Sequence, residues 1–162
     1  MVDGTAEIEA LGDSSRSRRE LAEKAANVIE DKIANSDYFS PEEAVRLAGD
    51  LVAYMAEARL HSTDQRRDDL EQGKFDANPD AKAIKLQKAN HMHSRRMELE
   101  AILVDARQGN FSKLKQYIRS RGDESGMANQ KKSKKMHKLA CAIPDQGDPY
   151  KLPTPAWQLD KE

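Results

Sequence analysis

The feature that most constrains the fold of this chain is a clear helix start at Ser40. Ser40 can accept hydrogen bonds from the first free backbone N–H groups, Pro41 fits the first helical position, and Glu43 can reach back to the cap. Gly73 can take the left-handed conformation that ends a helix. Gly49, between these signals, marks a close helix–helix approach or only lowers the helix propensity. Apolar residues follow the start at helical spacing: Val45, Leu47, Ala48, Leu51, Val52 and Met55.

A second helix start of the same kind lies at Asn78, with Pro79 at the first helical position. Gly109 is placed to end this helix. Its apolar stripe consists of Ile84, Met92, Leu99, Ile102, Leu103 and Ala106. Because a short connection joins two helices of similar length, we predict a long antiparallel hairpin over residues 40–108.

The composition fits an elongated helical protein better than a large compact domain. Hydrophobic residues make up 38% of the 162 residues, charged residues make up 34%, and the mean hydropathy is −0.86. Such a chain is too polar for a large core, yet its apolar periodicity is too regular for wholesale disorder. A hairpin of this kind leaves a wide apolar stripe unless other helices or other copies cover it. We therefore expect a homo-oligomer.

The segments around the hairpin complete an all-α fold. Residues 1–16 are small, polar and acidic and predict a flexible arm. Ser17 and Glu20 form a capping box that opens a flanking N-terminal helix. Residues 110–121 predict a short fourth helix, and extended tails are expected at both ends. The predicted parts of the chain are the arm 1–16, a helical domain 17–122, and a basic, proline-bearing C-terminal tail 123–162.

The strongest functional signal is a cluster of lysines after the fourth helix. A disordered basic segment neutralises phosphates and binds nucleic acid without sequence selectivity. The competing interpretation is a solubilising tail, and the sequence leaves both open. The predicted DNA-binding residues are Lys131, Lys132, Lys134, Lys135 and Lys138.

The C-terminal segment resembles a linear docking peptide. Four prolines between residues 144 and 155 lower the entropy lost on ordering, and an aromatic-rich set of side chains can act as anchors. These side chains dock a larger protein partner, or they latch the segment onto its own domain or a neighbouring subunit. The predicted anchors are Tyr150, Leu152 and Trp157.

Signatures of catalysis and metal binding are missing from the sequence. His91 and His93 are two residues apart, which places them about 200° apart on a helix. His137 and Cys141 can share a helix face, but two ligands without further partners make a weak zinc site. A phosphate-cradling glycine loop, a nucleophile elbow and a His-Glu-x-x-His helix are all absent. We expect a non-enzymatic protein without metal or cofactor.

Compartment signals are few. A single cysteine excludes an internal disulfide and favours a reducing compartment. The N-terminus lacks the basic start and apolar core of a signal peptide. No apolar run approaches the ~20 residues that cross a bilayer. We therefore expect a protein without a secretion signal or membrane span.

The order of these elements, over residues 17–138, resembles that of bacteriophage small terminase subunits, which form rings and recognise viral DNA. Small helical virion proteins, such as ejection or scaffolding proteins, share the pattern. The resemblance rests on the order of elements, and no functional residue is carried over from it. It implies an oligomer that handles DNA in viral assembly or genome packaging, in the host cytoplasm or the virion. The alternative is a structural or scaffolding protein whose C-terminal tail docks a larger partner.

Overall fold

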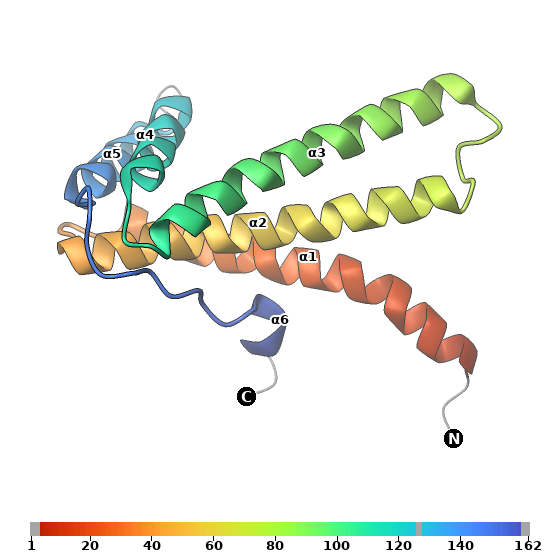
Figure 1. Cartoon of the computed structure of the whole chain (residues 1–162), viewed down its shortest axis with the longest axis horizontal. Coiled ribbons are helices and arrows are strands. Elements are labelled where there is room, and N and C mark those ends of the chain that lie inside the picture. Colours follow the sequence, from red (N-terminus) through yellow and green to blue (C-terminus); the bar gives the residue numbers. More distant parts are fainter. Residues whose placement is uncertain (1–3, 126–127, 160–162) are drawn as a thin grey trace.

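The computed structural model describes residues 4–125 and 128–159, and it describes side chains from residue 17 onward except those at 157 and 159. Regular secondary structure in these residues is helical, with one isolated bridge between Asn110 and Gln146 (Figure 1). The predicted all-α class is therefore confirmed. The helices are α1 (Gly4–Ala34), α2 (Pro41–Glu71), α3 (Pro79–Ala106), α4 (Ser112–Ser125), α5 (Gln130–Ala142) and α6 (Ala156–Leu159).

The helix starts and ends of the hairpin follow the predicted signals. The Ser40 hydroxyl accepts a hydrogen bond from the Glu43 backbone N–H at 3.1 Å, and the Asn78 side chain accepts one from Ala81 at 3.2 Å. Gly73 and Gly109 have φ angles of 73° and 84°, a conformation that glycine adopts at low cost. Helices α2 and α3 form the antiparallel hairpin that the sequence predicted.

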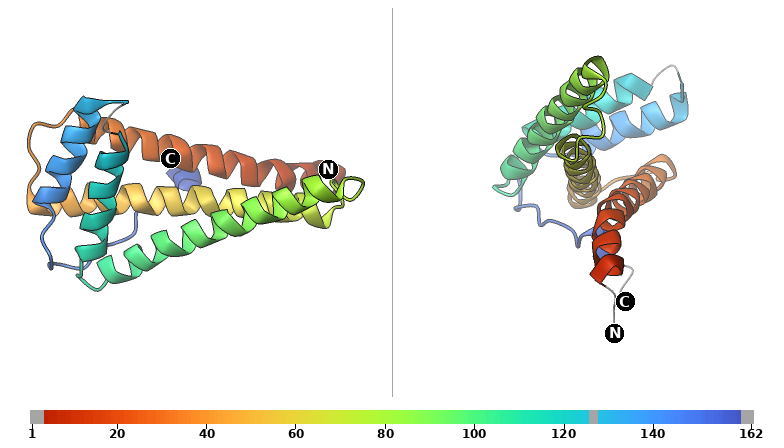
Figure 2. Two further views of the ribbon diagram at one scale, coloured as in Figure 1. Left: turned by 90° about the horizontal axis from the view of Figure 1, so that it is seen from above. Right: turned by 90° about the vertical axis from the view of Figure 1, so that its right-hand side faces the viewer.

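Helix α2 is the central element, because α1 packs along one side of it and α3 along another (Figure 2). Alanine, leucine and valine side chains dominate its buried positions, so neighbouring helices can approach closely. On α1 the buried positions recur every three or four residues, as in a helix seam. They are Ala22, Ala26, Ile29 and Ile33.

Helices α4 and α5 pack on one another and lie across the ends of α1 and α2 (Figure 2). Their contact completes the hydrophobic core at the end of the hairpin that lies away from its turn. We call this end the base, and we call the end around residues 64–88 the tip. The side chains that fill the base from these helices and their flanks are Phe111, Leu114, Ile118, Met136, Leu139 and Ile143.

Two predicted boundaries are wrong. Helix α1 begins at Gly4, so residues 4–16 of the predicted arm are helical, and the capping box at Ser17 lies inside the helix. Ala6, Glu7, Glu9, Ala10 and Leu11 are good helix formers. The helix continues through the weaker formers at residues 12–15, and the cap signal at Ser17 does not interrupt it. The predicted basic tail is also helical over residues 130–142, because α5 buries Met136, Leu139 and Ala140 in the base.

Candidate interaction surfaces

The segment between α5 and α6, residues 143–155, crosses the base as an extended strap. The Asp145 carbonyl accepts a hydrogen bond from the Phe111 N–H, and the Gly147 and Tyr150 N–H groups donate to the Gly109 and Ala106 carbonyls, all at 3.0 Å. These bonds tie the strap to the turn between α3 and α4. The strap is therefore an integral part of the fold rather than a free tail.

Tyr150 anchors the strap on α2. Its ring lies directly over Gly49, where an added Cβ would come within 2.4 Å of the ring. Its hydroxyl donates a 2.7 Å hydrogen bond to the Asp50 carboxylate. Gly49 therefore marks a close approach, as one interpretation of the sequence expected, but the approaching group is this aromatic ring rather than a helix.

Burial controls the ionisation of this pair. Burial raises the pKa of the Asp50 carboxyl, although the hydrogen bond from Tyr150 opposes the shift. Burial and the hydrogen bond to Asp50 together raise the pKa of the Tyr150 hydroxyl far above its ordinary value, so it remains a donor at neutral pH. The pair therefore has the chemistry of a structural anchor.

The three predicted docking anchors have different environments. Tyr150 is buried within its own chain, so it latches the strap and is not exposed to a partner. Leu152 is half exposed. The Trp157 side chain lies outside the described residues, but α6, which carries it, contacts α1. The latching alternative therefore describes residues 143–156, while docking of a larger partner stays a prediction.

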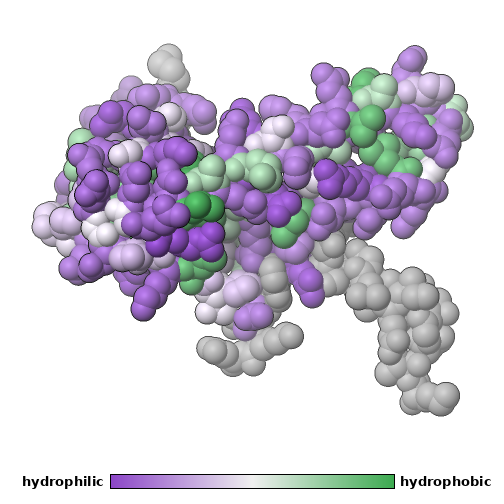
Figure 3. Space-filling model, in the orientation of Figure 1, coloured by the Kyte–Doolittle hydropathy of each residue, from purple (hydrophilic) through white to green (hydrophobic). Residues whose placement is uncertain are grey.

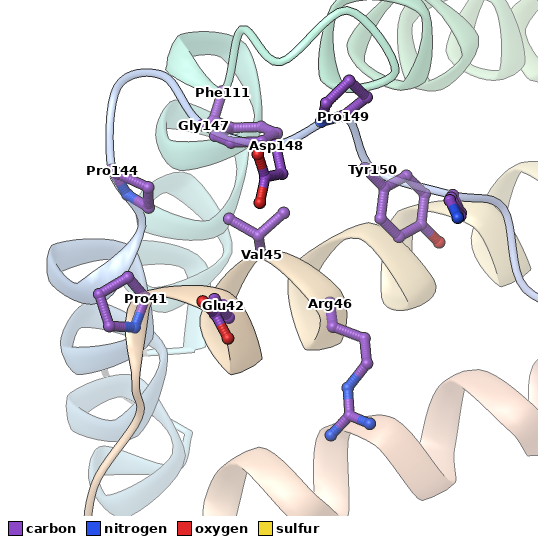
Figure 4. Close-up of a pocket in the computed structure, with 11 residues that line it drawn as sticks. Pro41, Glu42, Val45, Arg46, Phe111, Pro144, Gly147, Asp148, Pro149 and Tyr150 are labelled. Carbon is purple, nitrogen blue, oxygen red and sulfur yellow. The ribbon is translucent and has the colours of Figure 1, made fainter.

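A groove of about 510 Å³ runs between the strap and the start of α2. Figure 4 shows Val45, Phe111 and Tyr150 around it, with the Arg46 side chain directed toward α1. Three prolines and two aromatic side chains are among its eleven lining residues, together with two carboxylates and two cations. The charged residues are Glu42, Arg46, Asp148 and Lys151.

The five predicted DNA-binding lysines separate into two groups. Lys132 donates to the Glu30 carboxylate at 2.5 Å. Lys135 donates to the Ser36 carbonyl at 2.7 Å and pairs with Asp37. Lys138 donates to the backbone carbonyl of Asp37. These three lysines fasten α5 to the end of α1, which the sequence pattern alone did not reveal.

Lys131 and Lys134 form the second group, because both are exposed on α5. With Lys138 they fall at positions i, i+3 and i+7, which places them on one face of the helix. This face is a short basic stripe. The lysine spacing in the sequence does not distinguish the solvent-facing lysines from those that hold the fold together.

The Glu30 carboxylate lies at the centre of an ion-pair cluster at the base end of the hairpin. This role was not predicted from the sequence. Its carboxylate receives Lys132 from α5 and Arg121 from α4, each at 2.5 Å. Burial raises the pKa of Glu30, but the two cations outweigh burial and hold it below the ordinary value. Glu30 is one of many glutamates on a polar helix, so only its tertiary partners distinguish it.

The outer surface of α3 is the second candidate interface. Seven large apolar side chains are exposed among the described residues, and four of them belong to this one helix. Figure 3 shows apolar residues gathered over the arm that α3 forms near the tip. The four are Ile84, Leu86, Met97 and Val104.

Side chains of the types that bind metals are dispersed over the molecule. In residues 4–125 and 128–159, no three of them lie close enough together to hold an ion. His137 pairs with Asp123 at 2.7 Å, and Cys141 is exposed. None of the helices in these same residues is both long and apolar enough to cross a membrane.

Compared with known proteins, the chain matches no protein-family model, no curated protein and no solved structure.

Proposed function

We propose that this chain is a non-enzymatic helical assembly protein that works as a homo-oligomer. The observation that supports it best is the contrast along α3. This helix buries Leu99, Ile102 and Leu103 at the base but leaves Leu86 and Met97 about half exposed. Large apolar side chains concentrated on one helix mark a protein-binding surface more often than scattered single ones do. The order of helices supports a role in viral assembly or genome packaging.

The experiment is a mass measurement of the purified chain by light scattering over a range of micromolar concentrations. A homo-oligomer has a mass that is a multiple of the 18.2 kDa chain, and this mass falls on dilution once the concentration approaches the dissociation constant. A monomer at every concentration would overturn the proposal.

DNA handling is the second candidate function, and the basic stripe of α5 favours it. Lys131 and Lys134 are exposed on a helix that contains five lysines and no acidic residue. Lysines on one helix face can contact successive phosphates of a DNA strand. In this proposal the oligomer gathers the short stripes of several copies into one binding surface.

Salt-dependent binding to duplex DNA tests this second function. Changing Lys131 and Lys134 to alanine should reduce the slope of log affinity against log salt by roughly 0.9 for each phosphate that the variant no longer neutralises. Lys132, Lys135 and Lys138 stay unchanged, because their loss would loosen α5. Alanine at Lys24 and Lys151, which are exposed elsewhere, is the matched control. An equal reduction in both double variants would contradict a specific stripe.

Docking of a larger partner remains the third element of the proposed function. Leu152 is half exposed on the strap, and Trp157 follows it on α6. Because Tyr150 is already buried, a partner would contact the segment after it. Replacing Leu152 with serine should weaken partner capture while leaving the helical fold intact.

A further inference from the structure

Three of the four exposed apolar residues of α3 lie on one side of the helix. Leu86, Met97 and Val104 are 52%, 50% and 42% exposed, and they are separated by 11 and 7 residues. At 3.6 residues per turn, these spacings place the three side chains within about 20° of one another around the helix axis. They form an outer stripe on the side of α3 away from the buried Leu99, Ile102 and Ala106, whereas the buried Ala89 lies about 60° from Leu86 around the axis.

Polar residues complete the same stripe. Asn90, His93 and Glu100 fall between the apolar positions, so that steps of four and three residues alternate from Leu86 to Val104. This alternation is the repeat with which two helices pack along a shared seam. A polar residue within such a seam reduces its strength but fixes the register of the pair. The stripe is therefore suited to another helix.

The charge of α3 changes sign along its length. Residues 79–96 carry a net charge of +4, from five bases and the single acid Asp80. Residues 97–106 carry −3, from Glu98, Glu100 and Asp105. Packed helices lie about 8–10 Å apart, close to the screening length of ~8 Å at physiological salt. Two parallel copies would place like charges together, whereas two antiparallel copies would place opposite charges together.

Some of these charges already have partners in their own chain. Lys82 pairs with Asp76, Arg96 with Glu100, and Asp105 with Lys113. Such pairs partly neutralise individual residues, but the two halves of α3 still differ in the sign of their net charge. The charge therefore determines the direction of pairing, while the apolar stripe supplies the buried surface.

We infer that the outer stripe of α3 binds the same stripe of a second copy, with the two helices antiparallel around a twofold axis. This inference rests on the proposed homo-oligomer and names its interface. An antiparallel pair brings Leu86 of each copy opposite the half of the partner helix that holds Met97 and Val104. Such an interface is self-complementary, as twofold symmetry requires. Helix α3 lies at the edge of the molecule (Figure 2).

The first test replaces Leu86 and Met97 with glutamate, a good helix former that adds like charges across the twofold axis. We expect at least about a 100-fold increase in the dissociation constant, because removal of each apolar anchor contributes roughly tenfold. The matched control is Ile84→Glu. Ile84 is also 52% exposed on α3 but lies about 160° from Leu86 around the helix. Circular dichroism of each variant checks that helicity is retained.

The second test distinguishes the direction of pairing by disulfide trapping, with Cys141→Ser to remove the exposed native thiol. Leu86→Cys should cross-link to Met97→Cys or Val104→Cys in a mixture of variants. It should cross-link poorly to itself. Efficient self-linking of Leu86→Cys would overturn the antiparallel arrangement.

The outcomes separate this inference from the function on which it rests. A wild-type oligomer that dissociates in the Leu86 and Met97 variant, but not in Ile84→Glu, supports both. A wild-type oligomer that survives in the double variant overturns the interface and leaves the homo-oligomer standing. A wild-type monomer overturns both.

Discussion

The base and the tip of the same hairpin differ in how much they bury. At the base, α2 alone buries Leu47, Leu51 and Val52 against neighbouring helices. At the tip, no residue from 64 to 88 is buried, although this stretch includes the ends of both long helices. Two helices therefore continue for several turns beyond the core that supports them. Helix propensity, capping and surface pairs hold the tip, whereas a shared core holds the base.

The two ends differ in their ion pairs as well. Glu30 at the base is a largely buried acceptor for two cations from two helices. At the tip, Lys82 and Asp76 form a pair whose side chains are both at least half exposed. Exposed pairs contribute roughly 0–1 kcal/mol, whereas removing one member of a buried pair leaves an uncompensated charge. The charged groups of the base are therefore paired and largely buried within the chain, whereas those of the tip face the solvent.

Truncating one apolar side chain at each end should affect the base far more than the tip. Leu51→Ala removes a fully buried side chain from the base and should lower the free energy of unfolding by about 2–5 kcal/mol. Ile84→Ala removes a half-exposed side chain near the tip and should cost about 1 kcal/mol or less. Urea unfolding followed by circular dichroism measures both. Similar losses would show that the tip has a core of its own.

The hairpin was predictable because its signals are local. Ser40 and Asn78 cap their helices through residues three positions away, and Gly73 and Gly109 end them through their own backbone conformation. Of the six apolar residues predicted on α2, five are buried and Met55 is partly buried, but the buried face also continues through Tyr54 to Thr63. The apolar spacing predicted too much burial for α3 near the tip. Ile84 has the right spacing there, but no neighbouring helix covers it.

What sequence reasoning missed depends on partners far along the chain. The lysine cluster has a disordered composition, yet Met136 and Leu139 give α5 a buried face, and Glu30 lies about 100 residues before its partner Lys132. Tyr150 likewise meets Asp50 about 100 residues away. Gly49 was the one residue near Asp50 in the sequence that indicated the contact with Tyr150. Its missing side chain indicated a close approach but not which residue approaches.

The second prediction compares ion pairs at the two ends. Glu30→Gln removes the charge that Arg121 and Lys132 share, and it should lower the free energy of unfolding by about 1–3 kcal/mol. Asp76→Asn, the control at the tip, should change it by less than about 0.5 kcal/mol. Urea is the denaturant to use, because guanidinium would screen the charges. Equal losses would contradict the difference in burial.

The pH dependence of stability gives a second test of the Glu30 ion pairs. The pKa of Glu30 in the folded chain lies below its ordinary value of 4.5. Its contribution to stability is therefore complete above that ordinary value and is lost as the pH falls through the lower folded pKa. Stability measured between pH 7 and pH 3 should show this acid loss in the wild type. The loss should be smaller in Glu30→Gln than in the wild type.

The smallest expected effect concerns the strap that crosses the base. Tyr150→Phe keeps the ring over Gly49 but removes the donor to Asp50, which is left without this hydrogen bond. The expected loss at neutral pH is about 1–2 kcal/mol. Tyr38→Phe is the control, since Tyr38 is 74% exposed, and it should change stability little.

The same variant has a distinct acid response, because burial raises the pKa of Asp50 above its ordinary value of 3.8. Its ionised form therefore destabilises the fold above the folded pKa, and stability is regained as the pH falls through that pKa toward 3.8. The hydrogen bond from Tyr150 limits the rise, so its removal should raise the pKa of Asp50 further. The difference between wild type and Tyr150→Phe should then be largest at pH 7 and shrink toward pH 3. A loss of the same size at every pH would show that the hydroxyl does not act through the ionised Asp50 carboxylate. No loss at any pH would show that Tyr150 supports the strap through packing alone.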